Sequence, residues 1–269
     1  MEKPTEDFLK FEDLFDSSRF GLLSDLDGTL LPIGQDPGYS KFPAENRDLL
    51  IQLRDLTPLV AIISGRGAGN LAARVGIPGL VYVGNHGLER WVGGKGVVPD
   101  DAAEFIQRVD KAAFELTHDL WPGMQVEDKG ITLSLHYRQV EDPDAARAFF
   151  LPRAEEVAAD TGLVVFEGRR IIELRPPLPL NKGSAFQALV REYELTSAVF
   201  LGDDTTDVSA FQMARELREE GVCTSYSLGV VNKESPPDVA AHADGTVSSV
   251  GKVTSFLGWC VEKLSRSAT

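Results

Sequence analysis

Two acidic side chains near the start of the chain have the spacing of a pair that acts on one substrate. Asp25 and Asp27 directly follow the apolar run 20–24 and are themselves followed by Gly-Thr-Leu. Because they are two residues apart in extended chain, their carboxylates project from the same side of the strand end. One carboxylate could attack phosphorus, while the other gives a proton to the leaving oxygen and later activates water. The alternative is a pair of surface turn aspartates without a chemical role.

A second acidic group follows the apolar run 198–201 and contains Asp203, Asp204 and Asp207. Attack of a carboxylate on a phosphate sets negative charges against each other, so a cation must neutralise them. Mg2+ suits this task because it prefers oxygen ligands and substrate phosphates. Together with the first acidic pair, these aspartates form a candidate metal cradle. On their own they would be helix caps or loop residues.

Two further polar residues stand where they could hold a phosphoryl group. Lys182 opens a predicted helix, where an ammonium group and a helix N-terminus can both face an anion. Ser64 follows the apolar run 59–63 and could donate a hydrogen bond to the group being transferred. The alternatives are a solvated surface lysine and a serine that caps a helix.

The elements around these residues alternate between strand and helix. Apolar runs predict strands at 20–24, 59–63, 80–83, 198–201 and 223–231, and helical spacing predicts helices at 43–56, 70–75, 183–192 and 250–264. Continuous apolar strands separated by helices indicate a parallel sheet that is covered on both faces. Ligands of such sheets bind outside the carboxyl ends of the strands, which is where the polar clusters lie.

The middle of the chain follows a different pattern. We predict a helix over 101–120, a half-exposed strand over 131–137, a helix over 144–159 interrupted or bent near Pro152, and a hairpin of 163–166 with 171–174. This order indicates a small α/β unit with one open face. The predicted fold class is therefore α/β, with a Rossmann-like parallel-sheet core domain and a smaller inserted α/β domain. The core domain is expected over 1–96 and 178–269, and the inserted domain over 97–177.

The overall charge argues against several kinds of partner. The chain has 27 basic and 41 acidic residues and a formal net charge of -14, which would repel nucleic acid and anionic membranes. Cys223 and Cys260 lack the spacing of a disulfide framework or a zinc site. Residues 1–10 lack the apolar core of a signal peptide, and no run approaches the roughly 20 apolar residues of a membrane span. We therefore expect a cytoplasmic monomer with neither a nucleic-acid nor a membrane partner.

Four motifs, in this order, resemble those of the haloacid dehalogenase (HAD) superfamily. They are DLDGTL at 25–30, Ser-Gly-Arg at 64–66, Asn-Lys-Gly at 181–183 and GDDTTD at 202–207. The place of the inserted unit, between the second and third motifs, resembles the HAD class with an α/β cap domain. Within the superfamily the chain is similar to the trehalose-6-phosphate phosphatase family over nearly its whole length. That likeness rests on GNHGLER at 84–90, VEDKGITLSLHYR at 126–138 and IIELRP at 171–176.

The resemblance implies a magnesium-dependent phosphatase that acts on a small sugar phosphate, trehalose 6-phosphate. Asp25 would be the nucleophile and Asp27 the general acid and base, while Ser64 and Lys182 would hold the phosphoryl group. The residues at the metal would be Asp25, Asp27 through its backbone carbonyl, Asp203, and Asp204 and Asp207 in support through water or hydrogen bonds. The substrate-binding residues would be Arg66, His86, Glu89, Glu127, Lys129, Arg138 and Glu173.

Three of these substrate-binding positions belong to the predicted inserted domain. Carboxylates of Glu127 and Glu173 would accept hydrogen bonds from sugar hydroxyls, and the ammonium of Lys129 would donate them. A salt-bridged surface of that domain is the alternative for these three residues. For His86, the alternative is a side chain that caps local backbone.

Other features leave the activity partly open. Val208 stands where the family usually has Glu after GDDxTD, so a supporting carboxylate is missing near the metal or the inserted domain. The chain has no room for the synthase domain that is fused to this phosphatase in some relatives, and we expect a stand-alone enzyme. The alternatives are a phosphatase for sucrose 6-phosphate or a glycosyl phosphoglycerate, a phosphomutase, and a catalytically dead carbohydrate-binding or regulatory protein.

Overall fold

The computed structural model describes residues 6–16, 19–33, 41–168, 170–233 and 235–267. The chain separates into two compact units, which we call the core unit (Met1–Lys95 with Leu180–Thr269) and the cap unit (Gly96–Pro179). The domain boundaries expected from the sequence, after residues 96 and 177, stay a prediction. Arg169, in the turn of the predicted hairpin, and residues 1–5 lie outside the described residues.

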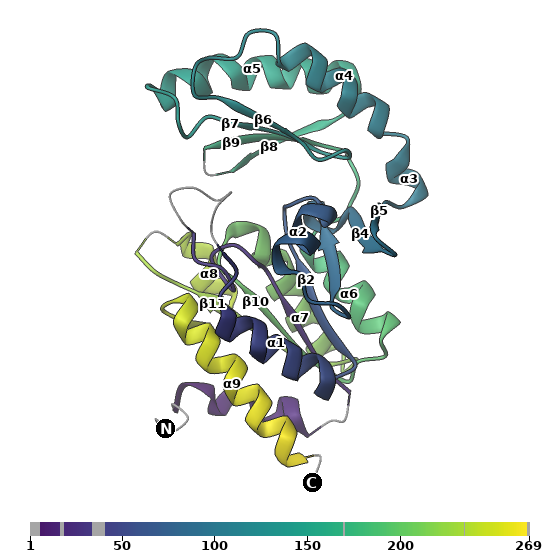
Figure 1. Cartoon of the computed structure of the whole chain (residues 1–269), viewed down its shortest axis with the longest axis vertical. Coiled ribbons are helices and arrows are strands. Elements are labelled where there is room, and N and C mark those ends of the chain that lie inside the picture. The colour runs from purple at the N-terminus through teal and green to yellow at the C-terminus, as the bar shows by residue number, and fades with distance from the viewer. Residues whose placement is uncertain (1–5, 17–18, 34–40, 169, 234, 268–269) are drawn as a thin grey trace. The chain divides into compact units, whose positions relative to one another are not determined.

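An eight-stranded sheet forms the centre of the core unit (Figure 1). Its order is β12-β11-β10-β1-β2-β3-β4-β5, with parallel pairing from β12 to β3 and antiparallel pairing of β3 with β4. The strands are β1 (Phe20–Ser24), β2 (Leu59–Ile63), β3 (Val81–Gly84), β4 (Glu89–Val92), β5 (Lys95–Val97), β10 (Ser197–Gly202), β11 (Thr224–Val230) and β12 (Gly245–Val247). Every residue of β1, β2 and β10 is buried, as expected for strands covered on both faces.

Helices cover both faces of this sheet, and each face has its own hydrophobic core. One core joins Leu22 of β1 to side chains of η1 (Glu6–Phe15), α1 (Ala44–Leu56), α2 (Ala68–Val75) and α9 (Val250–Ser267). The other joins Leu23 to side chains of α6 (Lys182–Glu192), α7 (Val208–Glu219) and α8 (Pro237–His242). Leu22 and Leu23 enter different cores because successive side chains of a strand point to opposite faces. In Figure 1, α1 and α9 lie side by side on one face, and α6 and α7 lie on the other.

The cap unit has a four-stranded antiparallel sheet in the order β6-β7-β9-β8. Its elements are α3 (Asp100–Ala103), α4 (Ile106–Leu116), β6 (Gln125–Asp128), β7 (Leu133–His136), α5 (Pro143–Thr161), β8 (Val164–Gly168) and β9 (Ile171–Arg175). Helices α4 and α5 lie over one face of the sheet (Figure 1). Leu133, Leu135, Ile172 and Leu174 point to that face and are fully buried. Their neighbours Ser134 and Glu173 therefore point to the opposite face.

The predicted α/β architecture is confirmed, with several differences in detail. The single helix predicted over 101–120 is wrong, because α3 ends at Ala103 and α4 begins at Ile106. Strand β6 was not predicted, since Val126 is its one apolar side chain. Strands β4, β5 and β12 and helices α7 and α8 were not predicted from the sequence either. Among the described residues, no helix is long and apolar enough to cross a membrane.

Candidate active site

The first acidic pair lies at the carboxyl end of β1, in a turn that is anchored to the neighbouring strand. The backbone N–H of Asp25 donates to the carbonyl of Leu201 on β10, 2.8 Å away. Gly28 has φ +90°, a value that favours glycine, and a Cβ there would lie 2.0 Å from Oδ2 of Asp203. The hydroxyl of Thr29 donates to Oδ1 of Asp203 at 2.9 Å. The carboxylate of Asp203 therefore lies close to Gly28 and Thr29 in the turn after β1.

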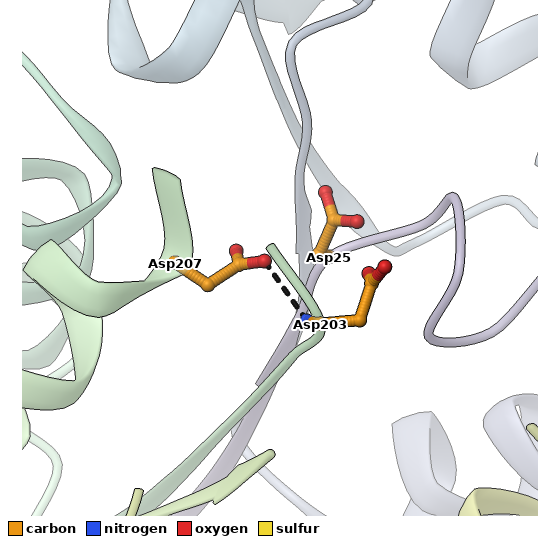
Figure 2. A group of neighbouring side chains, drawn as sticks. All are labelled: Asp25, Asp203 and Asp207. Carbon is orange, nitrogen blue, oxygen red and sulfur yellow. Dashed lines mark hydrogen bonds between the residues drawn. The ribbon is translucent and has the colours of Figure 1, made fainter. Parts of the chain in front are cut away.

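Three carboxylates from the ends of β1 and β10 come together, as Figure 2 shows. Asp25, Asp203 and Asp207 each offer an oxygen, and these oxygens lie within 4.8 Å of one another. Oδ2 of Asp207 accepts from the backbone N–H groups of Asp203 and Asp204, both at 3.0 Å. Asp207 thus fixes the backbone of the loop that carries Asp203. In Figure 2 the carboxylates of Asp25 and Asp203 point toward the same space.

Lys182 contacts two members of this cluster. Its Nζ lies 2.7 Å from Oδ1 of Asp25 and 2.7 Å from Oδ1 of Asp207. Burial lowers the pKa of Lys182, but the carboxylates of Asp207 and Asp25 outweigh it and hold the pKa above its ordinary range. The helix that carries Lys182 starts with a capping box between Asn181 and Ser184. The lysine is therefore a permanently charged, well-positioned cation.

The cluster still has an excess of negative charge. Burial, followed by the neighbouring carboxylates, raises the pKa of Asp25 to about 7 against the opposing effect of Lys182. Burial and the carboxylates of Asp25 and Asp207 raise the pKa of Asp203 to about 8. When all three acids are ionised, the ammonium of Lys182 compensates one of three negative charges. A site of this kind calls for a further cation.

The donor set fits a hard divalent cation such as Mg2+. Lys182 takes one oxygen of Asp25 and Thr29 takes one oxygen of Asp203, so each carboxylate has a second oxygen to offer. Both oxygens of Asp207 accept hydrogen bonds, which gives this residue a supporting place. All these donors are oxygen atoms, the ligands that Mg2+ prefers. Asp204, by contrast, is exposed and takes part in a capping box with Asp207 at the start of η3 (Thr205–Asp207).

Asp27 is held by an arginine of the second motif. Nε of Arg66 lies 2.6 Å from Oδ2 of Asp27, and Nη2 lies 2.8 Å from Oδ1. Such a two-point contact fixes the orientation of a carboxylate more firmly than a single hydrogen bond does. The side chain of Asp27 is 32% exposed, so it keeps access to a ligand. Arg66, which was predicted to contact the substrate, therefore contacts Asp27, the predicted general acid and base. Its contact with the substrate stays a prediction.

The loops after β2 and β3 are joined by backbone hydrogen bonds, which place Ser64, His86 and Glu89 in one region of the core unit. The N–H of His86 donates to the carbonyl of Ser64 at 2.9 Å. The ring of His86 packs against Gly65, where a Cβ would lie 2.5 Å from Nε2. Oε2 of Glu89 accepts from the backbone N–H of Ala68 at 2.7 Å and from Nδ2 of Asn85 at 2.9 Å. Glu89 thus supports the start of α2, and its predicted substrate contact stays a prediction.

The cap unit brings together the three residues expected to bind sugar. Nζ of Lys129 lies 2.5 Å from Oε1 of Glu173, and the hydroxyl of Ser134 donates to the same oxygen at 3.3 Å. The strand register pairs Glu127 with Ser134 and Ser134 with Glu173. These paired residues therefore point to one face of the sheet. Glu127 in turn contacts Nε2 of His136 at 3.1 Å. The salt bridge expected as an alternative is therefore present within the same group that could bind a polyol.

Arg138 belongs to the predicted site, whereas three further residues that contact the site were not predicted. Arg138 follows β7 and is exposed, and its substrate contact stays a prediction. The sequence analysis did not identify Thr29, Ser134 and Arg175, which contact Asp203 and Glu173. Thr29, Ser134 and Arg175 lie inside the motifs DLDGTL, VEDKGITLSLHYR and IIELRP, and this was the available signal. Their partners come from distant parts of the chain, so spacing in the sequence could not identify them.

The chain is similar to known proteins in both sequence and structure. A family model described as trehalose-phosphatase matches residues 23–242. The trehalose-phosphate phosphatase of Mycobacterium avium (strain 104) is 36% identical over 213 residues, which are 74% of this chain and 52% of the relative. The solved C-terminal domain of C. albicans trehalose-6-phosphate phosphatase has a TM-score of 0.75 and 25% identity, covering 96% of this chain and 98% of that one. A haloacid dehalogenase-like hydrolase from Bacteroides thetaiotaomicron has a TM-score of 0.60 at 16% identity, covering 92% and 99% of the two chains.

These similarities agree with the architecture and define its class. The likeness to the Bacteroides hydrolase supports the HAD-like fold alone, and the predicted fold class is confirmed. The chain spans 52% to 61% of the length of the first three mycobacterial relatives. The family model covers most of the chain, including the second acidic group and the whole cap unit. The chain therefore belongs to the trehalose-phosphatase family, and its fold is HAD-like.

Proposed function

We propose that this protein is a magnesium-dependent phosphatase that hydrolyses trehalose 6-phosphate to trehalose and phosphate. The carboxylate cluster of Asp25, Asp203 and Asp207, with Lys182 in contact with two of them, is the observation that carries the proposal. It combines a nucleophile, a permanent cation and oxygen donors for a divalent ion within a few ångströms. Membership of the trehalose-phosphatase family and the names of the relatives support the choice of substrate.

In the first half-reaction, Asp25 would attack the phosphorus atom. An oxygen of its carboxylate forms a bond to phosphorus, the bond from phosphorus to the sugar oxygen breaks, and an aspartyl phosphate results. Lys182 binds Oδ1 of Asp25 and so fixes the orientation of the attacking carboxylate. Asp25 and Asp203, with the backbone carbonyl of Asp27, would hold Mg2+, and Asp204 and Asp207 would support that loop. Bound there, Mg2+ would neutralise charge on the phosphoryl oxygens.

Asp27 would give a proton to the leaving sugar oxygen and later take one from the attacking water. Its two-point contact with Arg66 fixes the orientation of the carboxylate. The contact occupies both oxygens of Asp27, so it must open for one of them to reach the sugar oxygen. The phosphoryl group of the substrate is an anion that can draw the guanidinium of Arg66 away. Ser64 is buried, and its hydroxyl would donate a hydrogen bond to the same phosphoryl group.

The cap unit would supply the contacts to the sugar. Glu127 and Glu173 offer carboxylate oxygens and Lys129 offers an ammonium on one face of the sheet. Trehalose is neutral, and its hydroxyl groups can both donate and accept hydrogen bonds, which suits a mixed set of acceptors and donors. In this proposal the residues of the core unit act on the phosphoryl group, and the residues of the cap unit recognise the sugar. His86 and Arg138 would add contacts of the same kind.

The test is a panel of sugar phosphates given to the purified full chain with Mg2+ and again with EDTA. The panel contains trehalose 6-phosphate, sucrose 6-phosphate, a glucosyl phosphoglycerate and glucose 6-phosphate, and phosphate release is measured. We expect the highest kcat/KM for trehalose 6-phosphate and no turnover in EDTA. Asp25→Asn is the chemical control, because it keeps the shape of the side chain and removes its nucleophilic charge.

Each other result points to an alternative. A higher kcat/KM for another member of the panel would assign the protein to that substrate, and a transfer of phosphate between sugar positions would indicate a phosphomutase. Absence of turnover with every substrate would leave a carbohydrate-binding or regulatory protein. The monomeric state and the cytoplasmic location stay predictions, which sedimentation analysis and cell fractionation can check.

A further inference from the structure

One row of side chains crosses the whole sheet of the cap unit. The register pairs Glu127 with Ser134, Ser134 with Glu173, and Glu173 with Phe166, on strands β6, β7, β9 and β8. Directly opposed residues of antiparallel strands share a face and lie close enough to interact. The row therefore reads carboxylate, hydroxyl, carboxylate and phenyl ring. It lies on the face opposite the fully buried Leu133 and Ile172.

Phe166 ends this row as an exposed aromatic side chain. The residue is 47% exposed, so much of its apolar ring is accessible to a ligand. The guanidinium carbon of Arg175 lies 4.5 Å from the centroid of the ring. The same guanidinium donates to Oε2 of Glu173 from Nε at 2.7 Å and also from Nη2. Arg175 thus connects the ring to the carboxylate and fixes the two side by side.

This combination has the two kinds of surface that a sugar ring needs. A pyranose carries hydroxyl groups around its edge and C–H groups on its faces. Binding sites for such ligands combine apolar and aromatic surface with a few well-placed polar groups that set the orientation. Glu173, held by Lys129, Ser134 and Arg175, has a fixed orientation for hydroxyl groups. Phe166 presents apolar surface next to it.

We propose that Phe166 is a stacking surface for a glucosyl ring of the substrate, and that Arg175 is the positioning residue that holds Phe166 and Glu173 in register for it. The inference rests on the proposed function, since it assigns a place for the sugar of the same substrate. It adds a specificity-determining ring to the carboxylates and lysine already described. A phosphate ester without a sugar gains nothing from it.

The chain offers a matched control on the other layer of the same unit. Phe149 is also 47% exposed, but it belongs to α5 and packs against Trp121 and Phe150. Truncation of either phenylalanine removes the same atoms from an equally exposed position. Only the ring in the row lies beside oriented carboxylates. An effect of Phe166→Ala that Phe149→Ala does not share is therefore specific to the sheet face.

The experiment measures steady-state kinetics and binding with trehalose 6-phosphate and Mg2+. Phe166→Ala is expected to raise KM about tenfold with kcat within about twofold of wild type, which corresponds to about 1.4 kcal/mol of lost binding. In the non-hydrolysing Asp25→Asn background, the same change is expected to raise Kd for trehalose 6-phosphate by a similar factor in calorimetry. Phe149→Ala should leave KM and Kd unchanged, and Phe166→Tyr should restore them. Thermal melting checks that each variant is folded.

The role of Arg175 has its own readout. Arg175→Lys keeps the charge and loses the two-nitrogen contact, so it is expected to raise KM without lowering kcat. The double variant Phe166→Ala with Arg175→Lys should raise KM by less than the product of the single effects, because the two residues act through one arrangement. Unchanged KM and Kd in folded Phe166→Ala, or an equal loss in Phe149→Ala, would overturn the inference. Failure of the wild type to hydrolyse trehalose 6-phosphate would instead overturn the proposed function.

Discussion

The core unit and the cap unit each set carboxylates against a lysine that is shielded from solvent. In the core unit, Lys182 has a side chain 3% exposed and contacts Asp25 and Asp207. In the cap unit, Lys129 has a side chain 7% exposed and contacts Glu173. The residue types are therefore the same in both places. The two groups differ in how completely the negative charge is balanced.

In the core unit the negative charge of the carboxylates is only partly compensated. In the cap unit it is compensated by cationic side chains of the same chain. Three carboxylates, Asp25, Asp203 and Asp207, share one ammonium, so two negative charges are left over when all are ionised. In the cap unit, the two carboxylates of Glu127 and Glu173 stand in one row, and Lys129 and Arg175 supply two positive charges beside them. A cluster with surplus negative charge attracts a divalent cation and the phosphate that comes with it. A balanced group prefers a neutral ligand that can exchange hydrogen bonds, such as a sugar.

The largest expected effect separates the chemistry of the core unit from sugar binding in the cap unit. Asp25→Asn should lower kcat by at least about 10³-fold with both trehalose 6-phosphate and p-nitrophenyl phosphate, because it removes the nucleophile. Glu173→Gln, a change of the same kind, should raise KM for the sugar phosphate about 10-fold to 100-fold and leave the aryl phosphate unaffected. Asp204→Asn changes an exposed aspartate next to Asp203 and is the control. Its kcat should stay within about tenfold of wild type. Equal losses on both substrates for Glu173→Gln would contradict the division of roles.

The next effect compares the two lysines in stability. Lys182→Met leaves the buried carboxylates of Asp25 and Asp207 without their cation, and loss of one partner of a buried pair costs about 3–5 kcal/mol. Lys129→Met leaves Glu173 with Arg175 and Ser134, so we expect a loss of about 1–2 kcal/mol. Urea unfolding in EDTA measures both free energies of unfolding. If Lys129→Met proved the more costly change, the cap group would be the less balanced of the two.

The comparison also shows what the sequence could predict. Strands β1, β2 and β10 were predicted closely because they are continuous apolar runs, and polar residues mark their ends. Strand β6 was not predicted because Val126 is its one apolar side chain, so no apolar alternation marks it. The break between α3 and α4 has no Gly or Pro signal in the sequence.

The candidate site divides in the same way. Residue types and spacing predicted that Asp25, Asp203 and Asp207 would lie together, since parallel strands bring their carboxyl ends to one edge. The cap residues were predicted from the family resemblance. The partners that hold those residues could not be predicted. The contacts of Arg66 with Asp27, Thr29 with Asp203, and Arg175 with Phe166 all depend on tertiary packing. The difference in charge balance between the units became visible only with these partners in place.

A smaller effect should appear as a pH dependence of the core unit. The pKa values of Asp25 and Asp203 are raised from 3.8 to about 7 and about 8, mainly by burial. Between about pH 4 and pH 8 these two acids therefore bind more protons in the native protein than in the unfolded chain, and their ionisation lowers the free energy of unfolding as the pH rises. Mg2+ binds the ionised carboxylates, so the stabilisation it provides should grow over the same window, by on the order of 1–3 kcal/mol.

Thermal melting at pH 5, 6, 7 and 8, with Mg2+ and with EDTA, measures this difference. Titration of groups elsewhere in the chain affects both series and cancels. The expected increase should be much smaller in Asp25→Asn, which removes one of the two titrating acids. A stabilisation by Mg2+ that is constant from pH 5 to pH 8 would show that the carboxylates are ionised without the metal, and the charge argument for the core cluster would fail.

The smallest expected effect concerns Val208, which stands at the first position of α7, next to Asp207, where the family usually has Glu. Val208→Glu adds a carboxylate at a helix N-terminus, which favours the helix by about 0.3–1 kcal/mol. Asp25, Asp203 and Asp207 already supply the charge that one divalent ion needs, so the added acid should change the Mg2+ concentration for half-maximal activity by less than about threefold. Val208→Gln, of the same size and uncharged, separates the effect of charge from that of volume. A tenfold tighter response to Mg2+ in the glutamate variant alone would mean that Asp25, Asp203 and Asp207 do not hold the ion by themselves, and that relatives with Glu bind it more strongly than this protein does.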